Sequence, residues 1–445
     1  MQWHSLFSIY HITITSDKGD SVSLSLLSFF VKLLHSLCYI WYYFNIKSVS
    51  ENDMNILFYR YGSICEPDVL ETFGKFGFNV YEIKDEISDK NITPAQGIAI
   101  LNKVLDKKNV DVIFTINFYP FISEVCNIYK IPYISWIVDS PVVELFSVSI
   151  KNPYNRIFLF DRETYNDLHD LNPDCIFHLP LAINVTAKDK VIKNANSYDL
   201  EKFKSDISFV GSLYTEKCEY NDFFTTDYEL RGYLEGLMAA QLKVYGYYFV
   251  EECLSDDIVE RFKKDFKDFY TYPAESYLTD KKTLSERYLG TKISSMERVN
   301  IMKLLSTKFD VNLFTGSDTK DIPNVHNKGF VKSLTEMPVV FANSKINLNI
   351  TAKSIRSGIS QRVFDILGCK GFMLSNYQSE LFDYFVPGED FDYYEDLNDL
   401  YNKCNYYLSH QDVAKEMANS AYEKICKHHT IEIRIAQMFE TALKK

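Results

Sequence analysis

Predicted strands alternate with helical segments along most of this chain, and this alternation limits the possible folds more than any other feature. In the first part of the chain, predicted strands occupy residues 54–59, 79–83, 110–116, 133–138 and 156–160, with helical segments between them. Short, mostly apolar strands separated by helices predict a parallel sheet that helices cover on both faces. Ligands of such sheets bind beyond the carboxyl ends of the strands.

The same pattern begins again in the second half of the chain. A predicted strand at 207–210 runs into the turn Gly211-Ser212. Residues 215–292 then lack a clear strand and are helical, charged and rich in aromatic side chains. Strands and helices alternate again from residue 295 onward. We therefore predict an α/β protein with two Rossmann-like domains and a helical insertion in the C-terminal one.

Length and polarity place the boundaries between these parts. At 445 residues the chain is about three times as long as a typical single domain, which favours two large domains. A polar segment in the middle is typical of a domain connection. The predicted parts are an N-terminal extension (1–53), an N-terminal Rossmann-like domain (54–185), a linker (186–204), a C-terminal Rossmann-like domain (205–429) with its insertion at about 215–292, and a final helix (430–445).

The N-terminal extension contains an apolar stretch at 22–46 that is long enough to cross a bilayer but is interrupted by Lys32 and His35. It does not resemble a secretory signal, because a positively charged start and a small-residue cleavage site are both missing. Three interpretations remain open: a helix on the membrane surface, a poorly formed spanning anchor, or an extension upstream of a natural start at Met54.

Charge and cysteine usage exclude several classes of function. The chain has 48 basic and 60 acidic residues, a net charge of −12, and no stretch of clustered Lys and Arg. Nucleic acid is therefore not an expected partner. The nine cysteines are scattered singly without a Cys-x-x-Cys pair, so neither a zinc site nor a disulfide framework is predicted. We expect a cytoplasmic protein, with contact to the inner face of the membrane through residues 22–46 as the further possibility.

The segment 354–376 is the strongest chemical signal in the chain. It consists of a loop of small residues, a helix and a Gly-bounded turn into an apolar strand. The backbone N–H groups of Gly358, Ile359 and Ser360 are expected at the helix N-terminus, where free donors favour a diphosphate. Asp365 follows about one and a half turns later and could accept the hydroxyls of a ribose. The alternative is an ordinary amphipathic helix on which Asp365 is solvated.

Several motifs carry a resemblance to a known family. Residues 362–375 (RVFDILGCKGFMLS), the segment 385–390 (FVPGED) and the closing residues 429–434 resemble the C-terminal half of CgeB-like bacterial nucleotide-sugar glycosyltransferases. The strand and turn at 206–212 are similar to the start of that half. The N-terminal half, with Ser135-Trp-Ile-Val-Asp-Ser-Pro141 and Phe160-Asp-Arg162, resembles a clostridial domain of unknown function that is often fused to it.

The resemblance implies a GT-B fold, in which two Rossmann-like domains face each other and the final helix packs back on the N-terminal domain. It implies a nucleotide-diphosphate sugar as donor substrate on the C-terminal domain, a glycan or protein acceptor on the N-terminal domain, and no obligatory metal or other cofactor. Many relatives have two glutamates separated by seven residues, the first toward the sugar and the second on the ribose. This chain has Ser357 and Asp365 at those positions, so only the ribose contact is carried over.

Without a metal, helix N-termini and cations must offset the charge of the diphosphate leaving group. The candidates for donor binding lie at strand ends and in the loop around residue 358: Gly211, Ser212, Thr315, Gly316, Arg356, Gly358, Ile359, Ser360, Arg362 and Asp365. For Arg362 a surface salt bridge is the alternative, and Thr315-Gly316 could equally be a plain turn.

On the acceptor side, Asp139 is the candidate catalytic base because it follows a strand at its carboxyl end. Its alternative role is that of a turn or capping residue. We interpret Asp161-Arg162 as an ion pair satisfied within itself and Asn117 as a turn former. The histidines His178, His428 and His429 are predicted to be structural.

The predicted activity is hexosyl transfer from a nucleotide sugar to a hydroxyl group of a cell-surface glycan or protein. Two other functions remain open. A nucleotide-sugar epimerase could use the same scaffold, and a catalytically silent nucleotide-sugar-binding protein would explain the absence of an acid at Ser357.

Overall fold

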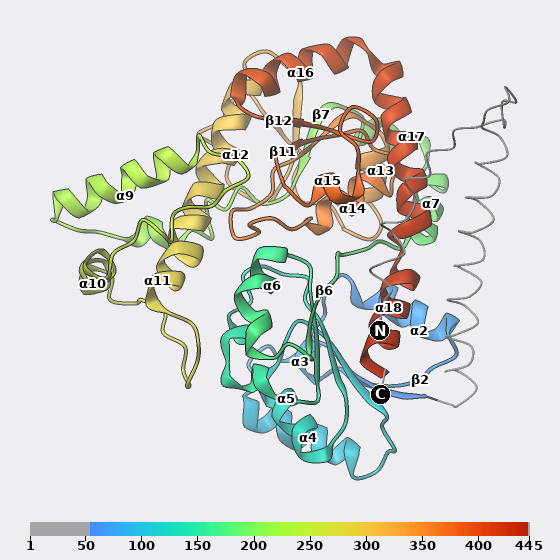
Figure 1. Cartoon of the computed structure of the whole chain (residues 1–445). Coiled ribbons are helices and arrows are strands. Elements are labelled where there is room, and N and C mark those ends of the chain that lie inside the picture. Colours follow the sequence, from blue (N-terminus) through green and yellow to red (C-terminus); the bar gives the residue numbers. More distant parts are fainter. Residues whose placement is uncertain (1–53, 444–445) are drawn as a thin grey trace, which may run out of the picture. The chain divides into compact units, whose positions relative to one another are not determined.

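Two six-stranded parallel sheets form the framework of the protein, as Figure 1 shows for the computed structural model. The structure describes residues 54–443. The apolar stretch 22–46, for which membrane contact was predicted, lies outside the described residues. Among residues 54–443, no helix is both long enough and apolar enough to span a membrane.

The N-terminal sheet has the strand order β2-β1-β3-β4-β5-β6, and all neighbouring strands are parallel. The central strands β3 and β4 are buried along their whole length, as expected when helices cover both faces. The strands are β1 (Asn55–Tyr59), β2 (Asn79–Ile83), β3 (Val112–Ile116), β4 (Tyr133–Trp136), β5 (Asn155–Leu159) and β6 (Ile176–His178). The α-helices are α2 (Glu66–Lys75), α3 (Asp85–Ser88), α4 (Pro94–Leu105), α5 (Pro120–Tyr129) and α6 (Arg162–Leu168), with short 3-10 turns η1 (Val143–Phe146), η2 (Val148–Lys151) and η3 (His169–Leu171).

The C-terminal sheet has the order β12-β11-β10-β7-β8-β9 and is also parallel throughout. Ile207, Leu313 and Leu348 lie in its buried core. The strands are β7 (Ser205–Val210), β8 (Val311–Phe314), β9 (His326–Asn327), β10 (Ser344–Asn349), β11 (Met373–Asn376) and β12 (Asp392–Tyr394). The helices that pack on this sheet and follow it are α12 (Thr291–Leu305), α13 (Met337–Ala342), α14 (Gln361–Leu367), α15 (Leu381–Tyr384), α16 (Leu397–Ser409) and α17 (Gln411–His428).

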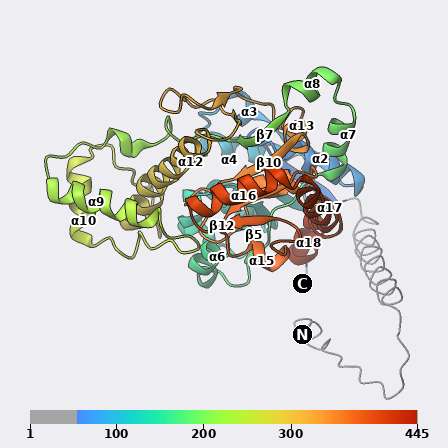
Figure 2. The ribbon, with the colours of Figure 1, turned by 90° about the horizontal axis from the view of Figure 1, so that it is seen from above.

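A group of helices between β7 and α12 has a core of its own. Phe223 stacks on Phe262 with 4.3 Å between ring centroids, and Phe269 stacks on Tyr288 at 5.4 Å. In Figures 1 and 2 its helices α9 and α10 lie to one side of both sheets. The elements are η4 (Glu219–Asp222), α9 (Tyr228–Gln241), α10 (Asp256–Asp265), α11 (Asp280–Thr283) and the π-helical segment η5 (Leu284–Gly290).

The connection between the two sheets contains helices α7 (Val185–Lys193) and α8 (Ser197–Lys202). Each begins with an asparagine cap: Asn184 Oδ1 accepts the N–H of Ala187, and Asn196 Oδ1 accepts that of Asp199. The polar composition that suggested a domain connection therefore supplies helix caps.

The last helix, α18 (Ile431–Leu443), lies against α2 of the N-terminal domain. Phe439 stacks on Phe78 with 5.1 Å between ring centroids, and Lys75 pairs with Glu432 at 2.8 Å. Two Rossmann-like domains and a final helix that returns to the first of them make this a GT-B arrangement. The predicted two-domain α/β fold is thus confirmed.

Candidate functional site

Three polar side chains at the carboxyl ends of β1, β3 and β4 form one cluster, in which Asp139 is the acid. Asn117 Nδ2 donates to Asp139 Oδ2 at 2.7 Å, and Tyr61 Oη donates to the same oxygen at 3.2 Å. Asn117 Oδ1 accepts the backbone N–H groups of Val138 and Asp139. Asp139 is exposed, and its other carboxylate oxygen, Oδ1, accepts no hydrogen bond within the described residues. That oxygen is therefore available to a ligand.

The two donors keep the Asp139 carboxylate in a fixed position. Burial and the negative charge of Asp139 raise the pKa of Tyr61 above its usual range, so Tyr61 remains a neutral donor. Asn117 has φ of +60°, a left-handed conformation that asparagine tolerates. Asn117 is thus the turn former that the sequence predicted, and it also orients Asp139, which the sequence did not predict.

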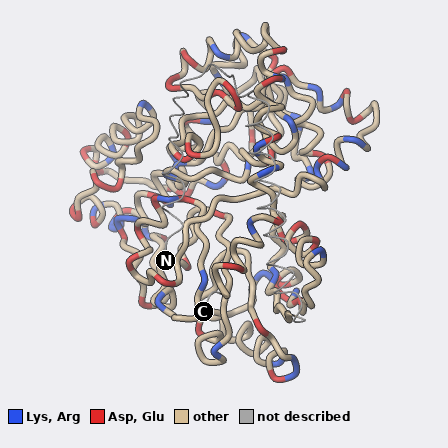
Figure 3. The backbone as a smooth tube through the Cα atoms, turned by 45° about the vertical axis from the view of Figure 1, so that its right-hand side comes forward, with Lys and Arg blue, Asp and Glu red and all other residues tan. Residues whose placement is uncertain are grey.

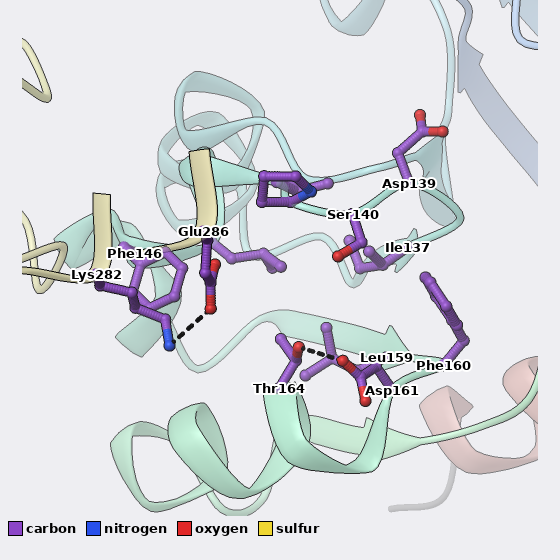
Figure 4. Close-up of a pocket in the computed structure, with 13 residues that line it drawn as sticks. Ile137, Asp139, Ser140, Phe146, Leu159, Phe160, Asp161, Thr164, Lys282 and Glu286 are labelled. Atoms are coloured by element: carbon purple, nitrogen blue, oxygen red, sulfur yellow. Dashed lines mark hydrogen bonds and ion pairs between the residues drawn. The ribbon is translucent and has the colours of Figure 1, made fainter. Parts of the chain in front are cut away.

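A shallow pocket lies next to this cluster, at the carboxyl ends of β4 and β5 (Figure 4). Its lining includes the apolar side chains of Phe146 and Leu159. The helical insertion contributes Lys282 and Glu286, which form an ion pair of 3.0 Å. Burial raises the pKa of Glu286, although Lys282 acts in the opposite direction. In Figure 4 the Asp139 carboxylate points away from Glu286, so the two acids face different parts of the site.

Four donor-site candidates lie in two turns of the C-terminal sheet that touch each other: Gly211, Ser212, Thr315 and Gly316. Ser317 Oγ accepts the backbone N–H of Leu213 at 2.8 Å, which joins the turn after β8 to the turn after β7. The Ser212 hydroxyl donates to Glu216 at 2.9 Å, and Thr315 Oγ1 accepts the N–H of Ser317. Both hydroxyl groups are therefore engaged inside the protein.

Arg298 on α12 lies directly beneath these turns and was missed by the sequence analysis. Its guanidinium donates to the carbonyl oxygens of Ser212 and Ile350, both at 2.6 Å, and lies 4.5 Å from the ring centroid of Tyr214. It is buried, forms no ion pair with another described residue, and has a pKa lowered by that burial. Basic and acidic positions are interspersed over the described chain (Figure 3), so a local cation of this kind matters.

The loop before α14, expected to bind a diphosphate, is held by a carboxylate of the N-terminal domain. Asp161 accepts the backbone N–H groups of Arg356, Ser357 and Gly358 at 3.0–3.1 Å. It also accepts the Ser357 hydroxyl at 2.8 Å. A Cβ on Gly358 would lie 2.7 Å from Asp161 Cα and 2.8 Å from the carbonyl oxygen of Phe160. Glycine is therefore required by the close approach of the two main chains.

The other two backbone N–H groups predicted to bind a diphosphate in this loop are not engaged by Asp161. The N–H groups of Ile359 and Ser360 donate to no other described residue. The Ile359 side chain is buried, whereas Ser360 is half-buried with its Oγ 3.5 Å from Asn349 Oδ1. Of the three predicted amides, that of Gly358 is engaged by Asp161, whereas those of Ile359 and Ser360 donate to no described acceptor.

The two arginines predicted for the diphosphate are both engaged in ion pairs. Arg356 contacts Asp167 of α6 at 2.5 Å. Burial acts to raise the pKa of Asp167, but Lys282 and Arg356 outweigh it and lower that pKa below its ordinary value. Arg362 lies 3.2 Å from Asp365 on the same helix and 5.3 Å from the ring centroid of Phe341.

Asp365 lines a second hollow, between α2 and the C-terminal domain. Gln361 Nε2 donates to Asp365 Oδ1 at 3.2 Å. Ile64 and Leu334, both partly exposed, also line the hollow, as does Lys188. The carboxylate of Asp365 is therefore placed at a hollow lined by both apolar and charged side chains, and it is not solvated on a free helix surface.

Our interpretation of Asp161-Arg162 as an ion pair satisfied within itself is wrong. Arg162 Nη2 pairs with Asp383 of the C-terminal domain at 2.6 Å, whereas Asp161 accepts hydrogen bonds from the C-terminal loop and from the first turn of α6. Glu380, also missed, is buried beside it: its carboxylate accepts the backbone N–H of Arg162 and lies 2.7 Å from both the Ser357 hydroxyl oxygen and His178 Nε2. Among residues 54–443, no three His, Cys, Asp or Glu side chains are grouped so that they could hold a metal ion.

Comparison with known proteins finds a family match in the C-terminal part of the chain. Residues 298–440, about a third of the chain, match the family model described as "Glycosyl transferase-like". The matched segment contains Arg298, the loop at 354–360 and Asp365. No curated protein matches the chain.

Solved structures with a similar arrangement include a glycosyltransferase from Rickettsia africae, at 11% identity over 88% of this chain and 100% of that one, with a TM-score of 0.48. The Anabaena protein HepE in complex with UDP and glucose matches at 9% identity over 88% and 99%, with a TM-score of 0.49. Sucrose-phosphate synthase from Thermosynechococcus elongatus matches at 10% over 87% and 98%, with a TM-score of 0.46.

Proposed function

We propose that this protein is a CgeB-like hexosyltransferase that transfers a sugar from a nucleotide-diphosphate sugar to a hydroxyl group of a cell-surface glycan or protein, without an obligatory metal. The observation that supports this most directly is the glycosyl transferase-like domain, which spans the loop at 354–360 and Asp365. The described cysteines are all free, which supports a location in the reducing cytoplasm.

The donor would bind at the carboxyl ends of β7, β8 and β10. In this proposal Asp365, at its hollow beside α2, accepts the ribose hydroxyls. The turns Gly211-Ser212 and Thr315-Gly316 contact the nucleotide through their main chain. The diphosphate lies near the free N–H groups of Ile359 and Ser360, and the buried Arg298 beneath the first turn offsets its charge.

On the acceptor side, Asp139 is the proposed base. Its free oxygen Oδ1 removes the proton of the acceptor hydroxyl as the hydroxyl oxygen attacks the anomeric carbon of the sugar. The bond from that carbon to the diphosphate breaks, and the nucleoside diphosphate leaves with the bonding electrons. Asn117 and Tyr61 hold the carboxylate through Oδ2, which leaves Oδ1 free to act. The neighbouring pocket, with Phe146 and Leu159 in its lining, is the proposed acceptor pocket.

The proposal is tested with the purified full-length protein and a panel of UDP-, GDP-, ADP- and dTDP-sugars. We expect one nucleotide class to raise the melting temperature, and the matching sugar nucleotide to be hydrolysed slowly by water in place of the acceptor. Asp365→Ala should weaken nucleotide binding, whereas Asp139→Asn should leave binding intact and abolish hydrolysis. If no nucleotide stabilises the protein, the donor site is wrong. Binding without any turnover would favour a silent nucleotide-sugar-binding protein.

A further inference from the structure

The loop at 354–358, next to the proposed donor site, is closed by a carboxylate that belongs to the other domain. Asp161 is 2% exposed and accepts from three consecutive backbone N–H groups and one hydroxyl of this loop. Within the N-terminal domain, the Asp161 carboxylate also accepts a hydrogen bond from the hydroxyl of Thr164 at 3.0 Å. A set of successive N–H groups directed at one anion is the arrangement by which loops bind phosphate groups.

The other polar groups of this loop also contact the N-terminal domain. Arg356 pairs with Asp167, and Ser354 exchanges two hydrogen bonds with Ser140, at 2.8 and 3.1 Å. Together these contacts define an interdomain seam along residues 354–358. The groups suited to a negatively charged ligand are thus already matched by N-terminal carboxylates, from Asp161 and Asp167.

The seam leaves no room for a ligand beside Asp161. A single added carbon at Gly358 would lie 2.7 Å from Asp161 Cα and 2.8 Å from a carbonyl oxygen, well inside van der Waals contact. A phosphate could therefore reach these N–H groups only after Asp161 has left them. Binding at this loop must be competitive with the Asp161 contact.

We propose that Asp161 is an internal competitor of the donor diphosphate: in the empty protein its carboxylate occupies the backbone N–H groups of residues 356–358, and donor binding displaces it and opens the seam. This inference rests on the proposed donor site. It adds that the N-terminal domain supplies the anion that holds the loop until a nucleoside diphosphate replaces it. The apparent affinity for the donor is then reduced by the fraction of time for which the seam is closed.

Removing the competitor should strengthen binding. For Asp161→Ser we expect a dissociation constant for the nucleoside diphosphate about tenfold lower than in the wild type, which corresponds to a seam open about a tenth of the time. Serine is too short to reach the loop but still caps α6, for which Asp161 is the N-cap residue. Asp161→Asn also keeps the cap but lacks the charge, and we expect a smaller gain, of about threefold.

The matched control is Asp383→Ala. It removes the Arg162–Asp383 pair, which also joins the two domains but touches none of the N–H groups of the loop. If Asp161 competes directly, this control binds the nucleoside diphosphate as the wild type does. An equal gain in the control would mean that any loosening of the domains has the same effect, and the competition would be refuted.

The experiment is isothermal titration calorimetry on the full-length wild type and the three variants, with UDP, GDP, ADP, dTDP and inorganic pyrophosphate as probes. Tighter binding of one nucleoside diphosphate and of pyrophosphate by Asp161→Ser and, less strongly, Asp161→Asn supports the inference. If the wild type binds a nucleoside diphosphate and the two Asp161 variants bind it equally well or more weakly, the inference is overturned but the proposed function is not. If no probe binds to any of the four proteins, the inference and the proposed function both fail.

Discussion

Asp139 and Asp161 follow adjacent parallel strands of one sheet, yet their chemical states are opposite. Asp139 is exposed, accepts from Tyr61 and Asn117 through one oxygen, and keeps the other oxygen free. Asp161 is 2% exposed, and a loop from the other domain takes its carboxylate. The difference teaches that a position at a strand end offers a carboxylate to the cleft, but the facing domain decides whether that carboxylate is available for chemistry.

The largest effect on activity should come from substitution of Asp139, the aspartate with a free carboxylate oxygen. We expect Asp139→Asn to lower the rate of sugar transfer by about 10²- to 10⁴-fold, because a general base contributes that much. Donor affinity should not change, since the amide preserves the contacts with Asn117 and Tyr61. Steady-state kinetics and nucleotide titration measure the two quantities. The control is Asp106→Asn, at an exposed aspartate after α4. Transfer at the wild-type rate by Asp139→Asn would remove Asp139 from the mechanism.

The contact between Asp161 and the loop at 354–358 can also be disrupted by a substitution in the loop. Gly358→Ala should lower the free energy of unfolding by about 1–3 kcal/mol, because the added carbon meets main-chain atoms that cannot yield. The control is Gly236→Ala in α9, where nothing lies within 4 Å of the new carbon. That change should stabilise the protein by about 0.5–1 kcal/mol. Chemical denaturation measures both changes. If both variants were equally stable, the close approach at the seam would be refuted.

Burial also distinguishes two histidines, the buried His429 and the exposed His410. Burial, with the nearby charge of Arg434, lowers the pKa of His429 to about 2. The folded protein thus keeps His429 neutral, while the unfolded chain takes up a proton below its ordinary pKa of 6.5. The resulting stability is fully present above pH 6.5 and is lost as the pH falls from 6.5 toward 2. At pH 5 the loss is about 2 kcal/mol relative to pH 7.

This pH dependence is measured by denaturation of the wild type and His429→Asn at pH 7 and pH 5. The asparagine variant lacks the titrating group and should lose less stability on acidification. His410→Asn, at an exposed position, is expected to keep the wild-type slope. Identical slopes in the wild type and His429→Asn would contradict the buried neutral state.

The smallest effect is expected at the exposed part of the domain contact. The Arg162–Asp383 pair is about two-fifths exposed on both sides, and exposed ion pairs contribute only about 0–1 kcal/mol. Asp383→Ala should therefore change the free energy of unfolding by less than about 1 kcal/mol. Measurement at low and high salt checks this: any loss should shrink with salt. A loss above 2 kcal/mol would show that this pair, and not Asp161, dominates the contact.

The sequence predicted much of the fold and of the open part of the site. The apolar strands and the helices between them gave two parallel sheets, and the position of Asp139 after a strand placed it at the carboxyl edge of the first. Arg298 and Glu380 were not found, because each lies among other polar and charged residues and nothing local distinguishes it. Their roles depend on partners far away in the sequence: Arg298 on the carbonyl oxygens of Ser212 and Ile350, and Glu380 on His178.

The sequence by itself determined the two Rossmann-like domains, because hydrophobic periodicity is a local property that each segment contains. It also determined which groups lie at strand ends, since these positions follow from the strands themselves. Only the tertiary structure decided which of them are free. Hydrogen bonding and burial depend on the facing surface, and for Asp161 that surface is a loop almost two hundred residues later in the chain. A carboxylate cannot both hold that loop and act on a ligand, and contacts between the domains settle which it does.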